Sequence, residues 1–201
     1  MNQTNNISLC GTVLQGGRFS HQSHDKSIFI FRLGVERLSG QLDTLNVYIT
    51  GAQLEQTPIA LGDRVRVSGQ VRSFNNKSGV GSYLVIYVFC KELSKTDDPD
   101  ENLVTLAGTV CKPPVFRQTP LGREICDLLL VVNRAGYSRC DYLPCIIWGL
   151  DAHAAAGLCV SDKIQVTGRL QSRGYTKVLD GRQIEKTAFE ISAAGFVTAE
   201  I

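Results

Sequence analysis

The chain contains one thirteen-residue pattern twice. LGDRVRVSGQVRS occupies residues 61–73 and VSDKIQVTGRLQS occupies residues 160–172, an offset of 99. Gly69 therefore corresponds to Gly168. This offset is far longer than the period of a solenoid repeat, and a single recurrence at such an offset indicates that a whole domain was duplicated. The chain is expected to fold as two similar domains.

Further matches extend the repeat along both halves. Three blocks match in the same order: LCGTV (9–13) with LAGTV (106–110), FRLGVER (31–37) with LLLVVNR (128–134), and VYITG (47–51) with CIIWG (145–149). The offset rises from 97 to 98 to 99, and only between the matched blocks. A one-residue slip would turn a strand inside out, so strands keep their register while loops absorb insertions.

A polar and acidic segment separates the two copies. KELSKTDDPDEN, at residues 91–102, contains a proline and is typical of a solvated linker. We therefore predict domains at 5–91 and 102–197, joined by a linker at 92–101. The 201 residues are 43% hydrophobic and 20% charged, which is enough apolar material for two packed cores.

Each copy is expected to contain five strands. In the second copy they are placed at 103–111, 124–133, 142–148, 163–172 and 183–191. Period-two alternation is clear in KIQVTGRLQ, and glycines inside strands, as at Gly108 and Gly168, mark bulges or sharp bends. A helix is expected at 150–160, and its counterpart in the first copy is weakened by Pro58. The predicted fold class is all-β, with two tandem five-stranded OB-fold Greek-key barrels, each with a short helix between strands three and four.

Several function classes are disfavoured. No apolar run approaches the ~20 residues of a membrane span, and the N-terminus lacks signal-peptide features, so a cytoplasmic location is expected. Most of the seven cysteines lie in apolar runs, as reduced thiols do, and no zinc-finger spacing is present. The three histidines lie at no catalytic spacing, and HQSHD at 21–25 is interpreted as a solvated turn. We expect neither an enzyme, nor a metal site, nor a cofactor.

The second copy resembles the bacterial single-stranded DNA-binding protein family along nearly its whole length. The resemblance is carried by NLVTLAGTV (102–110), PPVFRQTPLGREICDLLLVVNR (113–134), IIWGLDAHAAAG (146–157), and DKIQVTGRLQSRGY with DGRQ (162–183). Their order and spacing over about 90 residues is specific, although no single piece is. The first copy resembles the family only through its likeness to the second.

The resemblance implies that bases stack on aromatic side chains of the second barrel. The implied positions are Trp148 and Tyr142 on strand three, Tyr175 on the following hairpin, and approximately Tyr137 in a loop. All are aromatic in a chain that is only 7% aromatic. The basic residues expected to contact phosphates are Arg117, Arg134, Arg169, Arg173, Lys177 and Arg182. Such interleaving suits a single strand, because rings stack on any base while cations follow the phosphates.

The alternation of apolar and aromatic side chains in DYLPCIIW supports this placement independently of the family resemblance. It puts Leu143, Cys145 and Ile147 on one face, and Tyr142, Pro144, Ile146 and Trp148 on the other. The aliphatic face is the natural core, so the aromatic face should point outward. Two alternatives remain open: Trp148 packs under the following helix or against a partner subunit, and Tyr175 packs on its own hairpin.

The first copy offers fewer candidate residues. Tyr48 lies on its third strand, and its hairpin RSFNNKSGVGSY contributes Phe74 and Lys77. We interpret this copy as a weaker binding surface or as a pairing partner of the second.

The chain departs from the family in two ways. Members usually have one barrel followed by a tail with an acidic, hydrophobic tip, whereas this chain stops at TAEI, so that tail is expected to be absent. Members are typically homotetramers of single barrels. A two-barrel chain is expected to form a homodimer or to act as a pseudo-dimeric monomer.

Two functions compete. The first is sequence-nonspecific binding of single-stranded DNA in replication, repair or recombination, with RNA left open as a ligand. The alternative is an OB-fold protein-interaction adaptor of a primosome or replication complex, which the small net charge of +2 favours slightly. The two functions differ in their response to salt. For phosphate binding, the logarithm of the binding constant falls linearly with the logarithm of the salt concentration, and a protein interface does not follow this relation.

Overall fold

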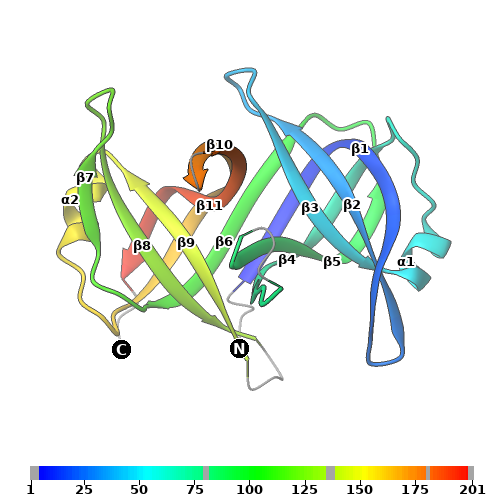
Figure 1. The fold of residues 1–201 in the computed structure, drawn as a ribbon, viewed down its shortest axis with the longest axis horizontal. Coiled ribbons are helices and arrows are strands. Elements are labelled where there is room, and N and C mark those ends of the chain that lie inside the picture. The colour runs from blue at the N-terminus through cyan, green and yellow to red at the C-terminus, as the bar shows by residue number, and fades with distance from the viewer. Residues whose placement is uncertain (1–4, 79–81, 135–138, 180–181, 199–201) are drawn as a thin grey trace. The chain divides into compact units, whose positions relative to one another are not determined.

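The computed structural model describes residues 5–78, 82–134, 139–179 and 182–198 (Figure 1). The first repeat contains, in chain order, β1 (Asn5–Ser23), β2 (Lys26–Glu36), β3 (Leu42–Thr50), α1 (Gly51–Gln56), β4 (Arg64–Asn75) and β5 (Leu84–Lys95). The second contains β6 (Glu101–Val110), β7 (Val115–Gln118), β8 (Glu124–Asn133), β9 (Cys140–Trp148), α2 (Leu150–Ala156), β10 (Lys163–Leu179) and β11 (Arg182–Thr198). No helix in these ranges is long and apolar enough to cross a membrane.

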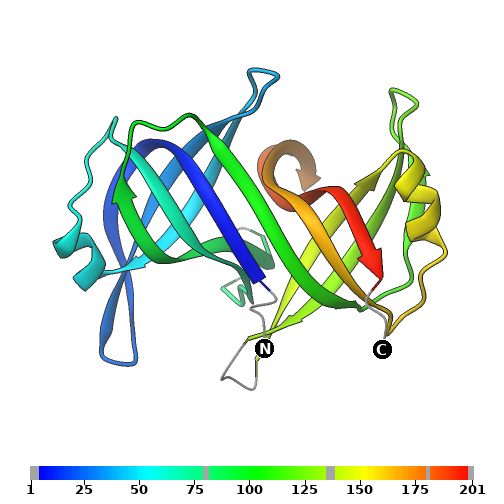
Figure 2. The ribbon, with the colours of Figure 1, turned by 180° about the vertical axis from the view of Figure 1, so that it is seen from behind.

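Each repeat forms a closed five-stranded barrel. In the first, β1 pairs with β2 and β4, β2 pairs with β3, and β3 runs parallel to β5, which pairs with β4. In the second, β6, β8, β9, β11 and β10 close in the same way, again with one parallel pairing, β9 to β11. The predicted all-β OB-fold class, with a helix between the third and fourth barrel strands, is confirmed (Figure 2).

Alternating side chains fill both barrels. The largest fully buried side chains include Leu9, Phe31, Leu33, Leu45 and Ile49 in the first repeat, and Leu106, Leu130, Leu143, Ile164 and Leu170 in the second. These positions follow the period-two pattern of the strands, because successive side chains point to opposite faces of a sheet. Cys10, Cys90, Cys126 and Cys145 join these cores as free thiols, and burial raises the pKa of Cys90 to about 12.

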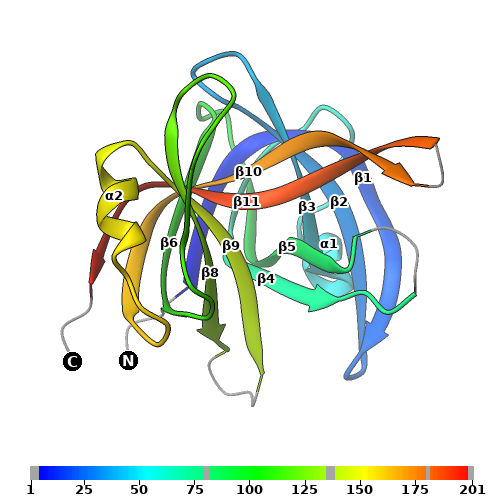
Figure 3. The same ribbon diagram turned by 60° about the vertical axis from the view of Figure 1, so that its left-hand side comes forward.

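The observed elements differ from the expected ones at several ends. α2 ends at Ala156, before Gly157, instead of continuing to residue 160. α1 forms ahead of Pro58, because Thr50 and Gln53 make a reciprocal capping box at its start. The β10–β11 hairpin is much longer than expected, pairing residues as far as Leu179 with Arg182 (Figure 3). β7 is a short additional strand that pairs with β8.

By contacts, the chain divides into two compact units that do not follow the repeat boundary throughout. One unit comprises Asn6–Arg72 and Tyr87–Leu103, and the other comprises Ser73–Ile86 with Val104–Ile201 among its segments. The segment that follows Arg72 in the first repeat is therefore grouped with the second barrel. The boundaries 5–91 and 102–197 stay a prediction about folding units.

The acidic linker is held in place rather than freely solvated. Asp100 pairs with Arg64 at 2.7 Å, and Arg66 pairs with Asp98 at 2.9 Å and Glu101 at 3.0 Å. These hydrogen-bonded carboxylates raise the pKa of both arginines. The linker interpretation missed these contacts because the arginines lie some thirty residues earlier, on β4. Because the groups are partly exposed, solvent screening keeps the contribution of each pair to stability small.

Only His24 and Asp25 of HQSHD lie in a turn, since residues 21–23 belong to β1, and a bulge is found at Gly168 but not where Gly108 pairs with Ile164. His24 and Asp25 have positive φ angles of 46° and 60°, which make the two-residue turn between β1 and β2. Pairing of β10 with β11 shifts register between Thr167 and Gly168, so Gly168 marks a bulge. A Cβ atom at Gly168 would clash with the carbonyl oxygen of Ser192.

Gly168→Ala should therefore lower the free energy of unfolding by about 1–3 kcal/mol, the usual effect of forcing extra volume into a packed site. Gly174→Ala is the matched control, because Gly174 lies on the same strand with no atom within 4 Å of an added Cβ. Chemical denaturation of the two variants measures the difference. Equal effects would contradict the close approach at Gly168.

Candidate nucleic-acid interface

Strand β9 separates an aliphatic core from an aromatic outer face. Leu143, Cys145 and Ile147 are buried, while Tyr142 is 41% exposed. The predicted alternation is thus confirmed at these positions. It is wrong at Ile146, which is only 6% exposed. Ile146 lies within the sheet, opposite Ser192 in the parallel pairing of β9 with β11.

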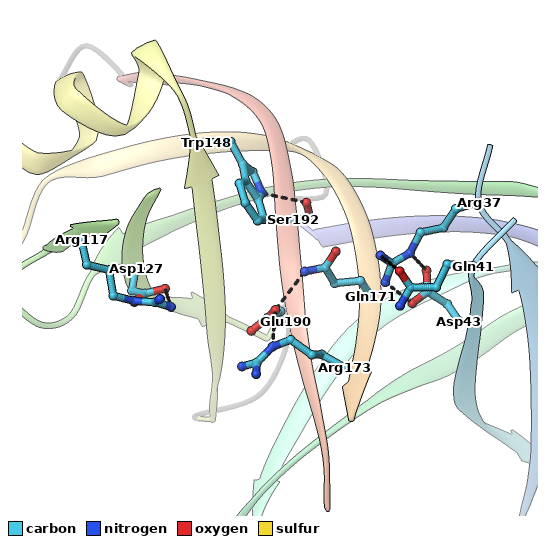
Figure 4. A network of polar contacts seen from close by, with 10 residues as sticks. All are labelled: Arg37, Gln41, Asp43, Arg117, Asp127, Trp148, Gln171, Arg173, Glu190 and Ser192. Atoms are coloured by element: carbon cyan, nitrogen blue, oxygen red, sulfur yellow. Dashed lines mark hydrogen bonds and ion pairs between the residues drawn. The ribbon is translucent and has the colours of Figure 1, made fainter. Parts of the chain in front are cut away.

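The indole of Trp148 is half-buried and held at one edge. Its Nε1 donates a hydrogen bond of 3.0 Å to the hydroxyl of Ser192 on β11 (Figure 4). The bond satisfies the indole donor and fixes the ring on the outer side of the barrel. A ring fixed in this way loses little conformational freedom when a base stacks on it.

Two of the predicted phosphate contacts are engaged by carboxylates. Arg117, on β7, donates to Asp127 of β8 at 2.5 and 3.2 Å, and this partner raises the pKa of the arginine. Arg134 donates to Asp141 at 3.0 and 2.6 Å. The Arg117 pair is exposed to solvent, whereas the Asp141 carboxylate is 1% exposed and its partner is largely covered.

The first repeat has a counterpart of this buried pair. Arg37 donates to Asp43 through Nε at 2.7 Å and through Nη2 at 2.6 Å (Figure 4). Arg134 contacts Asp141 through the same two nitrogen positions. In both repeats the arginine follows the second barrel strand and the aspartate lies on the third, so each pair closes a hairpin. The sequence signals for this role are the matched arginines that end FRLGVER and LLLVVNR and the matched aspartates, Asp43 and Asp141.

The β10–β11 hairpin carries the other predicted phosphate-contacting residues that the structure describes. Arg169 is exposed on β10. Arg173 lies 6.0 Å above the Tyr175 ring and 3.4 Å from the nearly buried carboxylate of Glu190, which also accepts a 2.9 Å hydrogen bond from Gln171 (Figure 4). Tyr175 is half-buried. Tyr137 and the side chains of Lys177 and Arg182 lie outside the described residues.

The first barrel has more clustered aromatic side chains than the sequence suggested. The Tyr48 ring packs on Tyr87 of β5 with 4.5 Å between centroids, and burial raises the pKa of its phenol. Arg72 lies 3.9 Å above the ring of Phe89, and Phe19 meets Phe29 edge-on at 5.9 Å. Tyr87 and Phe89 were not among the predicted site residues, although the alternation in LVIYVF places both opposite the core.

The hairpin after β4 presents the other residues predicted for the first repeat. Phe74 is 43% exposed, and Lys77 is exposed. The Asn76 amide donates a 2.6 Å hydrogen bond to the carbonyl of Tyr83, which keeps the two sides of the hairpin together.

Known proteins resemble this arrangement in both sequence and fold. Residues 101–197 match the model of the single-strand binding protein family. The match is confined to the second repeat. Single-stranded DNA-binding protein 1 of Staphylococcus aureus (strain COL) is 29% identical over 102 residues, 48% of this chain and 60% of that protein. Single-stranded DNA-binding protein 2 of S. aureus (strain MSSA476) gives the same values. The chain therefore spans less than two thirds of the length of these relatives.

The fold likeness extends over both repeats. The wild-type single-stranded DNA binding protein from Thermus aquaticus superposes with a TM-score of 0.78, covering 98% of this chain and 93% of that one, at 21% identity. At this identity the likeness concerns the fold alone. In the described ranges, no group of three or more His, Cys, Asp or Glu side chains is arranged to hold a metal ion.

Proposed function

We propose that the chain binds single-stranded DNA without base-sequence preference, stacking bases on aromatic side chains and contacting phosphates with Lys and Arg. The observation that carries the proposal is the outer face of β9, where Tyr142 is exposed and Trp148 is half-buried, on the side opposite the apolar core. Every base offers a π-face, so such rings bind unpaired nucleotides regardless of sequence, at about 1–3 kcal/mol per base.

Among the basic residues we assign different roles. Arg169, with Lys177 and Arg182 further along the same hairpin, is proposed to follow the phosphates beside Tyr175. Arg173 is proposed to join them, because its contact with Glu190 is longer, at 3.4 Å, than those that Arg117 and Arg134 make with their aspartates. Arg117 and Arg134 already pair with aspartates, so we propose that they shape the face instead of supplying free charge. Tyr137 remains a proposed loop contact.

The first barrel is proposed to carry a second, weaker surface around Tyr48. The Tyr48 ring is partly covered by Tyr87, which leaves less of its face for a base. We also propose a binding protein without catalytic activity, acting in replication, repair or recombination, as a homodimer or a pseudo-dimeric monomer. A sedimentation mass near 22.0 kDa would rule out the dimer.

An adaptor that docks another protein is the second candidate. The ion pairs Arg117–Asp127 and Arg173–Glu190 favour it, because they neutralise cations on the proposed face. The two functions differ in their response to salt, since only phosphate binding releases condensed counterions.

We expect the affinity for a thymidine oligomer of about 30 nucleotides to fall as salt rises from about 50 to 200 mM. The log–log slope should be near −0.7 for each phosphate neutralised, so three or four contacts give a slope of about −2 to −3. Fluorescence anisotropy of a labelled oligomer measures this, with a duplex of equal length as the control. A slope near zero, or equal affinity for the duplex, would favour the adaptor.

A further inference from the structure

The end of the acidic linker, residues 96–101, forms a strap over β1 and β4 of the first barrel. Arg64 donates to the carbonyl of Asp98 at 2.5 Å and pairs with Asp100 at 2.7 Å. The amide of Thr96 donates to the carbonyl of Arg64 at 3.2 Å. The strap and both strands belong to one compact unit, so these contacts lie within a single body.

Arg66, two residues further along β4, is held by two more carboxylates. It pairs with Asp98 at 2.9 Å and with Glu101 at 3.0 Å. The carboxylate of Glu101 also accepts a hydrogen bond from the hydroxyl of Ser8 on β1. Two guanidinium groups therefore face three carboxylates, and the closed strap reverses the charge that this part of β4 would otherwise present.

The strap also completes the burial of the Cys10 thiol. Ser8, Cys10 and Thr12 share one side of β1 because side chains alternate along a strand. Ser8 and Thr12 are half-buried, whereas Cys10 is 0% exposed. Its Sγ donates to the carbonyl of Asp98 at 3.3 Å and lies 3.6 Å from Nη2 of Arg64. The access of a reagent to this thiol therefore reports whether the strap is open.

The two arginines are placed to bind successive phosphates. They lie two residues apart on one side of β4, about 6.8 Å along the strand, which is close to the phosphate spacing of an extended single strand. A guanidinium binds a phosphate with the same fork geometry that it uses for a carboxylate. The side chains of Arg64 and Arg66 are 30% and 33% exposed, and that of Asp98 is 55% exposed. Solvent screening keeps such pairs weak, so a competing anion can replace them.

We propose that Arg64 and Arg66 form a phosphate-binding site for a single strand on β4 of the first barrel, and that the strap closes this site until a strand displaces it. The inference rests on the proposed function and adds a regulated contact away from the aromatic residues. Displacement is favoured at low salt, because a polynucleotide releases condensed counterions when arginines neutralise its phosphates. The strap carboxylates provide no such gain, and the closed strap lowers the affinity for a strand.

Two variants of the full chain with equal net charge test the proposal. Asp98→Asn/Glu101→Gln removes both ion pairs of Arg66. Asp97→Asn/Glu55→Gln is the matched control, because both side chains are exposed and make no ion pair in the described ranges. Anisotropy of a labelled thymidine oligomer should show about threefold to fivefold tighter binding by the first variant than by the control, the effect of freeing weak exposed pairs.

Arg66→Ala separates the proposed site from a general effect of charge. In an Arg66→Ala background, Asp98→Asn/Glu101→Gln should change the affinity no more than the control substitutions do, because the guanidinium that they free is gone. An effect of overall charge would persist in this background, and that result would overturn the inference.

Alkylation of Cys10 by iodoacetamide, followed by peptide mass, measures strap opening without DNA. The rate should be higher in Asp98→Asn/Glu101→Gln than in the control, and in the wild type it should rise with salt, which screens partly exposed pairs. Cys90 is buried in the same barrel and should stay unreactive, which separates an open strap from a loosened barrel.

The outcomes distinguish the inference from the proposed function. If the wild type binds the oligomer and the two charge-matched variants bind it equally, the inference is overturned while the proposed function stands. An unchanged Cys10 rate in Asp98→Asn/Glu101→Gln overturns it as well, because the ion pairs then do not hold the strap. If the wild type does not bind the oligomer at low salt, both are overturned.

Discussion

Replacing Asp141 with alanine should lower the free energy of unfolding by about 3–5 kcal/mol, the largest stability effect expected in this chain. The carboxylate is buried and accepts from Arg134 twice and from the Ser73 amide once. Its removal leaves a largely buried guanidinium without its counter-charge and a backbone N–H without its acceptor. Both losses cost more than the pair itself contributes, because the remaining groups stay desolvated.

Asp127→Ala provides the comparison within the same barrel. Asp127 also binds an arginine through two oxygens, but that pair is exposed to solvent and should contribute only about 0–1 kcal/mol. Urea denaturation of both variants, with Asp43→Ala as the first-repeat counterpart of Asp141→Ala, measures the difference. An Asp141 variant no less stable than the Asp127 variant would show that the buried pair is not structural.

Replacing Trp148 with alanine should reduce the affinity for a short thymidine oligomer by about tenfold or more, because stacking contributes about 1–3 kcal/mol per base. Tyr48→Ala should cost less. The Trp148 ring is larger and is held at its edge by Ser192, whereas the Tyr48 ring is partly covered by Tyr87. Anisotropy of a labelled oligomer compares the two variants without relying on tryptophan emission.

Stability must be checked alongside affinity, since both rings pack on their neighbours. Thermal unfolding of each variant separates a lost stacking contact from a loosened barrel. Ser192→Ala should fall between wild type and Trp148→Ala, because it frees the indole without removing it. Equal losses for the Trp148 and Tyr48 variants would mean that the first barrel binds as strongly as the second.

The barrels were predictable because local patterns determine them. Alternation assigned the core positions of β9 and β10, and Gly168 marked the bulge that the structure contains. The duplication strengthened the prediction, because the strands assigned in one repeat must match those assigned in the other. The exposed position of Tyr142 followed from the same alternation.

The partners of the arginines were not predictable in the same way. From the sequence alone, Arg134 looks like a surface cation. Its pairing with Asp141 depends on how β8 pairs with β9. Ile146 lies opposite Ser192 of β11, a pairing that the alternation along β9 alone does not reveal. The anchoring of Ser73 depends on contacts between residues some seventy positions apart, which no local pattern encodes.

The most direct test of single-strand binding on the outer face of β9 is the emission of Trp148 during titration with a thymidine oligomer of about 30 nucleotides. Binding on this face should give quenching by the single strand, reversal by added salt, and no quenching by a duplex of the same length. Unchanged emission at low salt, or equal quenching by the duplex, would contradict it.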